Sequence, residues 1–422
     1  MKNLTFIDLF SGCGGLSLGL LNSGWRGIFA VEKSADAFLT LKHNLVNRSR
    51  HNKHRPKFDW PEWLAVEPFE IRQFIKQNRK QLLSLKGKVN LVAGGPPCQG
   101  FSFAGKRNSK DTRNQLFRHH IEMVDILKPE VVLMENVRGI DTGFNAKSGK
   151  SRGRPVKSYA SKIKDSLKEC GYEVQQKVVR AMDFGVPQFR PRYFTIGIRT
   201  SLYRSMNNVD IFKMLLAKRT LFLKKKGLPV DRAVTVAEAV SDLVTAGKTV
   251  VACTESESFN GFMEVGYGAP ASSYQLLMRN GLNGQSPNSH RLVNHRVQTV
   301  RRFKGILANC RKGVQLSEQK RRLLKIKKNA ITPLDGDQPS HTLTTLPDDL
   351  LHYSEPRIHT VREHARFQSF PDWFEFLGNY TTGGDRRARE CPRYTQVGNA
   401  VPPLLAEAIG EILADIIKGK VG

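Results

Sequence analysis

Paired cysteines, the signature of zinc sites and disulfide frameworks, are missing from this sequence. Among 422 residues there are six cysteines, at positions 13, 98, 170, 253, 310 and 391, and no two of them form a CxxC pair. Neither a structural zinc site nor a set of disulfides is expected from such scattered positions, and no metal is expected to bind. The spacing indicates a reducing, intracellular setting.

Long apolar runs are missing as well. Asp8 and a glycine cluster interrupt the N-terminal segment, where a secretory signal needs an unbroken apolar stretch. Nowhere in the chain do about 18 apolar residues follow one another, as a membrane-spanning helix requires. We therefore expect a soluble protein of the cytoplasm with no membrane partner.

Acidic residues are few compared with basic ones. The chain has 38 Asp and Glu against 67 Lys and Arg, which gives a formal net charge of +29. The excess is uneven, because residues 201–330 contain 23 basic and 8 acidic residues. Such a charge suits a polyanionic partner and makes nucleic acid the leading candidate, with a merely solvated basic surface as the alternative.

A stretch at residues 89–102 organises the rest of the chain. The apolar run 89–93 predicts a strand buried on both faces of a parallel sheet, and Gly94-Gly95-Pro96-Pro97 then shapes a loop just before Cys98. Polar and small residues follow, including Gln99 and Ser102, and they are poor neighbours for a packing residue. We predict that Cys98 is a nucleophile, and the alternative is a small buried core residue.

The N-terminal segment predicts a strand at 4–10, a glycine turn at 11–15 and a helix at 16–22. Such a turn lets a ligand lie against bare backbone at the start of a helix. Because Ser17 stands where a dinucleotide fingerprint has its third glycine, a nucleoside-type cofactor is favoured. A second strand at 27–31 ends in Glu32, which is placed to accept ribose hydroxyls or, alternatively, to cap a helix.

A further buried strand at 131–134 should deliver Glu135 to the same sheet edge as Cys98. A carboxylate that ends an apolar strand loses hydration, so Glu135 is expected to hold a proton near neutrality and to donate it. The alternative is a structural carboxylate paired with an arginine. A hairpin at 173–181 and 193–198 follows, and alternate spacing would point Gln188, Arg190 and Arg192 to one side.

The sequence also predicts the local structure of four other segments. Residues 43–65 read as an irregular surface segment, and the basic segment 105–114 as a mobile loop able to close on a phosphate backbone. Residues 116–127 and 159–170 predict helices that end at Pro129 and Gly171.

Six short motifs together resemble the cytosine-5 DNA methyltransferases, in the order which that family uses. The resemblance covers residues 4–200 and about 340–402. Pro-Pro-Cys-Gln followed by Glu-Asn-Val at this separation is specific to the family. The matching motifs are Asp8–Gly15, Gly94–Ser102, Glu135–Val137, Gln188–Arg192, Thr360–Pro371 and Gln396–Pro402.

By this resemblance the fold is a Rossmann-like α/β sheet and the cofactor is S-adenosylmethionine. Phe10 would lie near the adenine and Glu32 on the ribose, and Glu70-Ile71 stands where the family usually has Asp-Ile. The whole set of expected cofactor contacts is Phe10, Gly12, Gly14, Gly15, Leu16, Glu32, Lys33, Glu70, Ile71, Pro96, Asn399 and Val401.

The chemistry itself explains the catalytic residue types. C5 of cytosine is a poor nucleophile, and addition of the Cys98 thiolate to C6 makes the ring enamine-like, so that C5 can attack an electrophilic methyl group. Glu135 would protonate N3, and by the resemblance Arg192 binds O2 while Arg190 supports the site. A base then removes the C5 proton and the thiolate leaves, but the sequence does not identify that base. The cytosine must be flipped out of the duplex.

Three regions follow from the motifs and the charge. Residues 1–200, completed by 393–422, would form the catalytic domain, 201–356 a smaller target-recognition domain, and 357–392 the hinge and closing motif. The polar segment 261–290 has side chains able to reach base edges. Expected contacts to double-stranded DNA are Gln99, Ser102, Asn136, Arg291, Arg296, Arg301 and Arg302.

Other functions stay open at this level. An RNA cytosine-5 methyltransferase shares the cofactor and the thiol chemistry, a noncatalytic nucleic-acid binder would explain only the charge, and Ser17 argues against a nicotinamide oxidoreductase. By family analogy we expect a monomeric bacterial modification enzyme, associated with the nucleoid, that protects DNA against a cognate restriction endonuclease.

Overall fold

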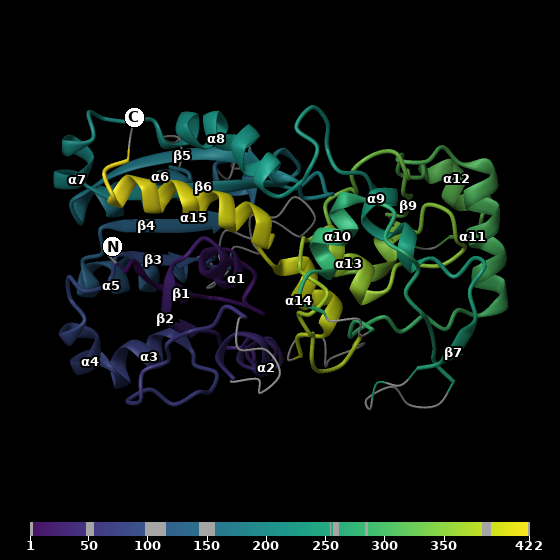
Figure 1. Ribbon diagram of the computed structural model, residues 1–422, viewed down its shortest axis with the longest axis horizontal. Coiled ribbons are helices and arrows are strands. Elements are labelled where there is room, and N and C mark those ends of the chain that lie inside the picture. The colour runs from purple at the N-terminus through teal and green to yellow at the C-terminus, as the bar shows by residue number, and fades with distance from the viewer. Residues whose placement is uncertain are drawn as a thin grey trace, which may run out of the picture.

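One half of the protein is built on a six-stranded sheet and the other half on shorter helices (Figure 1). The computed structural model describes residues 3–47, 55–97, 115–142, 157–253, 255, 261–282, 286–326, 328, 330–381 and 390–420. The strands lie in the order β2-β1-β3-β4-β6-β5. Their bounds are β1 Thr5–Leu9, β2 Arg26–Val31, β3 Leu91–Gly94, β4 Val131–Asn136, β5 Tyr172–Arg180 and β6 Pro191–Arg199.

The first four strands are parallel, and β6 runs antiparallel between β4 and β5. This confirms the expected α/β class and each of the predicted strands. In the register, Ala93 of β3 lies between Asp8 of β1 and Leu133 of β4. The carboxyl ends of these three strands therefore meet at one edge of the sheet, where open α/β sheets bind ligands.

Helices cover both faces of the sheet, so strand residues alternate between two apolar cores. Phe6 and Ala93 point into one core, and Ile7 and Val92 point into the other. Helices α1 (Gly15–Asn22), α8 (Ile211–Lys225) and α15 (Pro403–Ile417) line the first core. Helices α3 (Ile71–Gln77), α4 (Arg79–Ser84), α5 (Phe117–Leu127) and α6 (Tyr159–Glu169) line the second.

The second half of the protein shares the first of these cores. Its elements are α9 Val236–Val240, β7 Val250–Ala252, β8 Met263–Val265, α10 Ser273–Arg279, α11 Val297–Asn309, α12 Glu318–Leu323, β9 Thr332–Pro333, β10 Leu350–Leu351, α13 Val361–Phe367 and α14 Arg393–Asn399. Helices α9, α10, α13 and α14 contribute residues to the core that reaches the sheet. Helix α11 instead packs on a separate small core with Phe303 and Ile306.

The helices just after residue 201 belong spatially to the sheet. Helix α8 packs beside α15 in the sheet's first core, with α7 (Thr200–Ser205) directly before it. Lys218 and Lys225 of α8 form ion pairs with Asp415 and Glu411 of α15. The first 25 or so residues of the expected recognition domain thus lie on the sheet half.

Residues 43–65 differ from the expectation of a surface segment. A π-helical turn, Lys42–Val46, continues helix α2 (Ala35–Leu41), and the chain then returns to the core. Phe58 is 4% exposed with its ring 5.5 Å from that of Phe6, and Leu64 is equally buried. Residues 55–65 are irregular as expected, but the surface placement was wrong for Phe58 and Leu64, because these two apolar side chains pack into the core from among polar neighbours.

Among the residues that the structure describes, no helix is long and apolar enough to cross a membrane.

Candidate active site

The turn after β1 forms an open cradle of backbone. Phe10 and Gly12 have φ values of 59° and 55°, and Gly14 has 96°, so the chain passes through the left-handed region three times before α1 begins. At Gly12 nothing lies within 4 Å of the place where a side chain would start, whereas at Gly14 that place is filled by Leu45. A ligand can therefore approach the bare backbone at Gly12.

Glu32, at the end of β2, holds this turn through a hydrogen bond. Its Oε2 accepts a hydrogen bond of 2.8 Å from the backbone N–H of Gly12, and its Oε1 accepts one of 2.7 Å from Ser34. Burial raises the pKa of the Glu32 carboxyl, against the lowering effect of these N–H donors. The carboxylate lies beside the cradle, as the ribose interpretation requires, while its bond to Ser34 also orders the start of α2.

Ser17 explains the departure from the dinucleotide fingerprint. Its hydroxyl donates to Oδ2 of Asp8, which is fully buried in β1. Burial raises the pKa of Asp8 to about 7, and the hydrogen bond from Ser17 opposes that rise. Ser17, at the position of the third glycine, is therefore the hydrogen-bond partner of the buried Asp8.

Four other expected cofactor residues differ in their exposure and contacts. Glu70 caps α3 by accepting from the N–H of Gln73 at 3.0 Å, and the adjacent Phe69 donates its N–H to the carbonyl of Glu32. The Glu70-Ile71 pair is thus held next to the end of β2 through the hydrogen bond of Phe69. Lys33 is exposed, whereas Leu16 and Ile71 are buried in the two cores.

The closing motif returns to the cradle from the other end of the chain. A side chain at Gly15 would clash with the carbonyl of Val401, and one at Gly19 would clash with α15. Asn399 is exposed at the end of α14, and Val401 is 7% exposed. The structure therefore brings together both ends of the expected cofactor site, which are almost 400 residues apart in the chain.

The loop expected to carry the nucleophile is described only up to residue 97. Gly94 cannot hold a larger residue, because a Cβ there would clash with the carbonyl oxygen of Leu9 in β1. Pro96 is buried, and its carbonyl accepts a hydrogen bond of 3.1 Å from the side chain of Asn136. Cys98, Gln99, Ser102 and the segment 105–114 lie outside the described residues.

Glu135 lies beside the start of that loop. The place of a Cβ on Gly95 is 3.2 Å from Oε2 of Glu135. Oε1 of the same carboxylate pairs with Nε of Arg192 at 2.9 Å, and the two side chains are 12% and 11% exposed. The ion pair named as the alternative is thus present, at the strand edge where an acid for the reaction was expected.

Asn136 and Arg190 have buried structural contacts instead of open ones. Asn136 is 7% exposed, and its side chain donates to the carbonyl of Pro96, so it has a structural partner at the start of the loop. Arg190 is 1% exposed and donates to the carbonyls of Leu343, Gly398 and Ala400. Gln188 reaches Leu343 as well, whereas Arg192 turns to Glu135.

The four arginines expected to contact DNA fall into two groups. The guanidinium of Arg291 lies between the rings of Phe262 and Tyr380, at 3.8 and 3.5 Å from their centroids. This group borders a pocket of about 220 Å³ and is half-buried. Arg296 precedes α11, and Arg301 and Arg302 lie on it, all three exposed.

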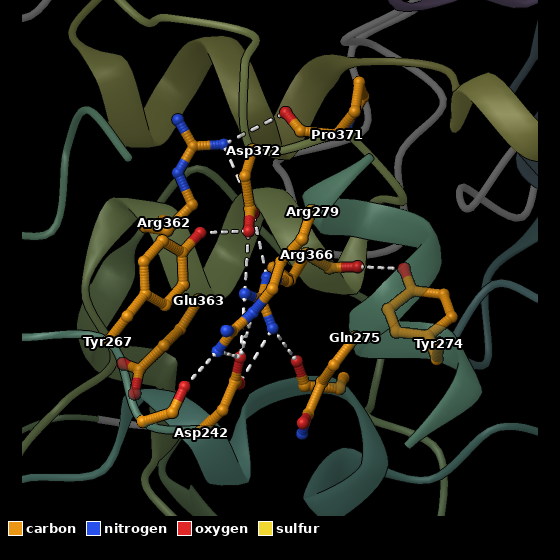
Figure 2. A network of polar contacts seen from close by, with 12 residues as sticks. Asp242, Tyr267, Tyr274, Gln275, Arg279, Arg362, Glu363, Arg366, Pro371 and Asp372 are labelled. Carbon is orange, nitrogen blue, oxygen red and sulfur yellow. Dashed lines mark hydrogen bonds and ion pairs between the residues drawn. The ribbon is translucent and has the colours of Figure 1, made fainter. Parts of the chain in front are cut away.

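A buried network around α13 was not predicted from the sequence (Figure 2). Arg366 forms paired hydrogen bonds of 2.8 to 3.0 Å with Asp242 and with Asp372. Arg279 of α10 also pairs with Asp242, and the hydroxyl of Tyr267 donates to Asp372. The closing motif is therefore tied to residues 242–279 by buried charges. Because Arg366 and Asp242 are 124 residues apart in the sequence, no local pattern predicts their contact.

Known proteins match this chain over almost its whole length. The family model described as C-5 cytosine-specific DNA methylase matches residues 4–415. The Type II methyltransferase M.DdeI of Desulfomicrobium norvegicum is 30% identical over 418 residues, which are 97% of this chain and 88% of the relative. The Type II methyltransferase M1.HphI of Haemophilus parahaemolyticus is 30% identical over 414 residues, 97% and 86% of the two chains.

A solved structure has the same fold. It belongs to a candidate DNA modification methyltransferase encoded within an E. coli prophage, and it aligns over 99% of this chain and 100% of its own with a TM-score of 0.63. The two sequences are 24% identical.

Proposed function

This chain belongs to the C-5 cytosine-specific DNA methylase family, and we propose that it acts through a covalent adduct between Cys98 and its target base. The enzyme transfers a methyl group from S-adenosylmethionine to C5 of cytosine in DNA. One observation carries the proposal: the Glu135–Arg192 pair lies against Gly95, three residues before Cys98, at the strand edge that also holds the glycine cradle.

The residues around the cradle suit the expected cofactor. Gly12 offers open space over bare backbone, Glu32 lies next to it, and Asn399 is exposed where the closing motif returns. Phe10 borders the same turn with a partly buried ring that can pack against a flat base. We propose that these four residues hold S-adenosylmethionine, which supplies an electrophilic methyl group when it is bound.

The protein groups would act on the cytosine ring in sequence. The Cys98 thiolate adds to C6, and Glu135 gives a proton to N3 as negative charge develops on the ring. Arg192 already contacts Glu135, so its remaining N–H groups can donate to O2 of the same base. Once C5 carries the methyl group, loss of the C5 proton to a base, departure of the thiolate and return of the N3 proton to Glu135 would complete the cycle.

The substrate is proposed to be a specific sequence of double-stranded DNA with the target cytosine flipped out. Residues from about 230 to 356 would choose the sequence, because they hold the polar segment 261–290 and lie opposite the strand edge (Figure 1). Since the relatives are Type II methyltransferases, we propose a monomeric cytoplasmic enzyme that protects DNA from a cognate endonuclease. Bisulfite sequencing of DNA from cells that express the chain would give the target sequence.

A mechanism-based trap tests the adduct. Duplex DNA with 5-fluorocytosine at the target should form a complex that survives denaturant, because fluorine cannot leave as the C5 proton does. Cys98→Ser should form none, whereas Cys310→Ser, a control at a partly exposed cysteine of α11's C-terminal cap, should form the adduct at the wild-type rate. An adduct that persists in Cys98→Ser would show that the nucleophile is another residue.

A further inference from the structure

Helices α11 and α12 carry an unusually dense positive charge. Residues 291–330 contain 13 lysines and arginines and a single acidic residue, Glu318, whereas the whole chain has a net charge of +29. About a tenth of the sequence therefore carries some two-fifths of the net charge. A cluster of like charges destabilises the folded state by repulsion, so a cluster this dense is expected to have a partner.

The cations of this segment point to solvent. Nine of them are exposed: Arg296 directly precedes α11, and the other eight lie on both helices and on the turns that follow them. Of these eight, only Arg322 has an ion-pair partner among the described residues, Glu318, whereas the half-buried Lys328 of the same segment pairs with Asp348 and Asp349. The eight on the helices and turns are Arg301, Arg302, Lys304, Arg311, Lys312, Lys320, Arg322 and Lys325. The surface that they form is called the distal basic surface below.

The distal basic surface rests on its own apolar core. Phe303 and Ile306 on the inner side of α11 are 8% and 0% exposed, and they pack with Leu316 and Ile331. This small core is separate from the one shared by the sheet and by α9, α10 and α13. The helices that carry these charges therefore pack on a core of their own, which fixes the position of their backbone.

The place of the distal basic surface sets it apart from the active site. In Figure 1, α11 and α12 lie at the end of the molecule away from the sheet, and α9, α10 and α13 lie between them and the strand edge. A duplex held at the strand edge with its cytosine next to Glu135 occupies the opposite side of these three helices. In residues 291–330 the 13 lysines and arginines outnumber the six asparagines and glutamines, whose amides can read base edges, and this excess suits phosphate contacts.

We propose that the distal basic surface binds a second segment of duplex DNA, through its phosphates and without sequence preference, while the target duplex is held at the strand edge. Binding of this kind raises the effective concentration of DNA around the enzyme. It also allows transfer between segments of one long molecule during the search for a target. The inference rests on the DNA substrate and not on the proposed roles of Cys98 and Glu135.

A second-duplex binding assay tests this directly. The enzyme is first saturated with a short unlabelled duplex that contains the target, and a fluorescent duplex of unrelated sequence is then titrated at several salt concentrations. The wild type should bind the second duplex, with affinity falling steeply as salt rises. Arg301→Gln/Arg302→Gln/Lys304→Gln should weaken that binding by about 10- to 100-fold near 0.1 M salt and lower the log–log salt slope by about 2 to 3.

Lys320→Gln/Arg322→Gln/Lys325→Gln, on and just after α12, removes cations that are not among the expected target contacts. It should weaken second-duplex binding to a similar extent and should methylate the short target duplex at the wild-type rate. A matched control, Lys76→Gln/Lys80→Gln/Lys86→Gln, removes three exposed cations from α3, α4 and the turn after it, at the other end of the molecule. It should bind the second duplex as the wild type does. If the α11 variant does not fold, Lys320→Gln/Arg322→Gln/Lys325→Gln tests the same surface from α12.

Several results would overturn the proposal. One is no uptake of a second duplex by the saturated wild type, and another is unchanged uptake by the α11 variant. Equal loss of second-duplex and target-duplex binding would place these arginines in the target cleft instead. Equal loss in the control would show a general charge effect, and preferential binding of anionic vesicles over DNA would assign the surface to a membrane. Failure of the short duplex to bind at all would count against the proposed DNA site itself.

Discussion

Replacement of Glu135 by glutamine separates its proposed role in catalysis from its role in the fold. Glutamine keeps the shape and an oxygen that can accept from Nε of Arg192, now 2.9 Å from Oε1 of the carboxylate. It cannot give a proton to N3. If Glu135 is the acid, methyl transfer should slow by about 10²- to 10⁴-fold, which corresponds to roughly 3 to 5 kcal/mol of barrier.

The cost to stability should be smaller than the cost to the reaction. Both side chains of the pair are about one-tenth exposed, and removal of one partner from a buried pair costs about 3 to 5 kcal/mol when the other charge is left without a contact. Because glutamine retains the acceptor, we expect a fall of about 1 to 3 kcal/mol in the free energy of unfolding. Urea unfolding measures this, and the affinity for target DNA should change little.

Exchange of the C5 hydrogen with solvent reports ring activation without methyl transfer. Glu135→Gln should lose most of this exchange and Cys98→Ser all of it. Glu411→Gln, which loses only an ion pair with Lys225 between α15 and α8, serves as the control and should exchange as the wild type does. Wild-type exchange in Glu135→Gln would refute the reasoning, because the carboxyl would then have no part in activating the ring.

Three further substitutions test the packing and the electrostatics. Gly94→Ala should unfold or strongly destabilise the protein in thermal melts, because its Cβ would clash with the carbonyl of Leu9 in the neighbouring strand. Gly95→Ala should melt close to the wild type but methylate more slowly, since its Cβ would lie 3.2 Å from the movable carboxyl of Glu135. Burial lowers the pKa of His364 to about 4, so the unfolded chain binds more protons than the native one between pH 4 and 6.5. Stability should fall by about 3 kcal/mol as pH drops through that window, and His364→Phe should remove this part of the dependence in urea unfolding at each pH. An unchanged pH dependence in His364→Phe would contradict this assignment.

The sheet could be predicted because its signals are local. The run 89–93 is mainly apolar and is followed at once by Gly94. These few residues alone indicate both a strand buried on both faces and the place where it ends. The edge position of Glu32 and Glu135 followed from the same reasoning, because each directly ends such a run. Parallel strands then brought their carboxyl ends together.

Partners far apart in the sequence could not be predicted. Nothing near Arg190 in the chain indicates that its guanidinium is buried against the carbonyls of Leu343 and Ala400, because those contacts exist only after the two halves pack. The burial of Phe58 has the same cause. For Glu135 both interpretations were available in advance, and the choice of Arg192 as its partner depends on the antiparallel pairing of β4 with β6.

The pairing of β4 with β6 also links the catalytic and the cofactor-binding parts of the proposed site through a single short segment. Arg192, in β6, holds the carboxyl of Glu135, and Arg190, two residues earlier, donates to the carbonyls of Gly398 and Ala400 on either side of Asn399. The acid that would act on the base and the residue that would hold the cofactor are therefore set by neighbouring positions of one chain segment. Because a buried arginine with several carbonyl partners has little freedom to move, the distance between base and methyl donor is expected to depend more on this segment than on the loops around it.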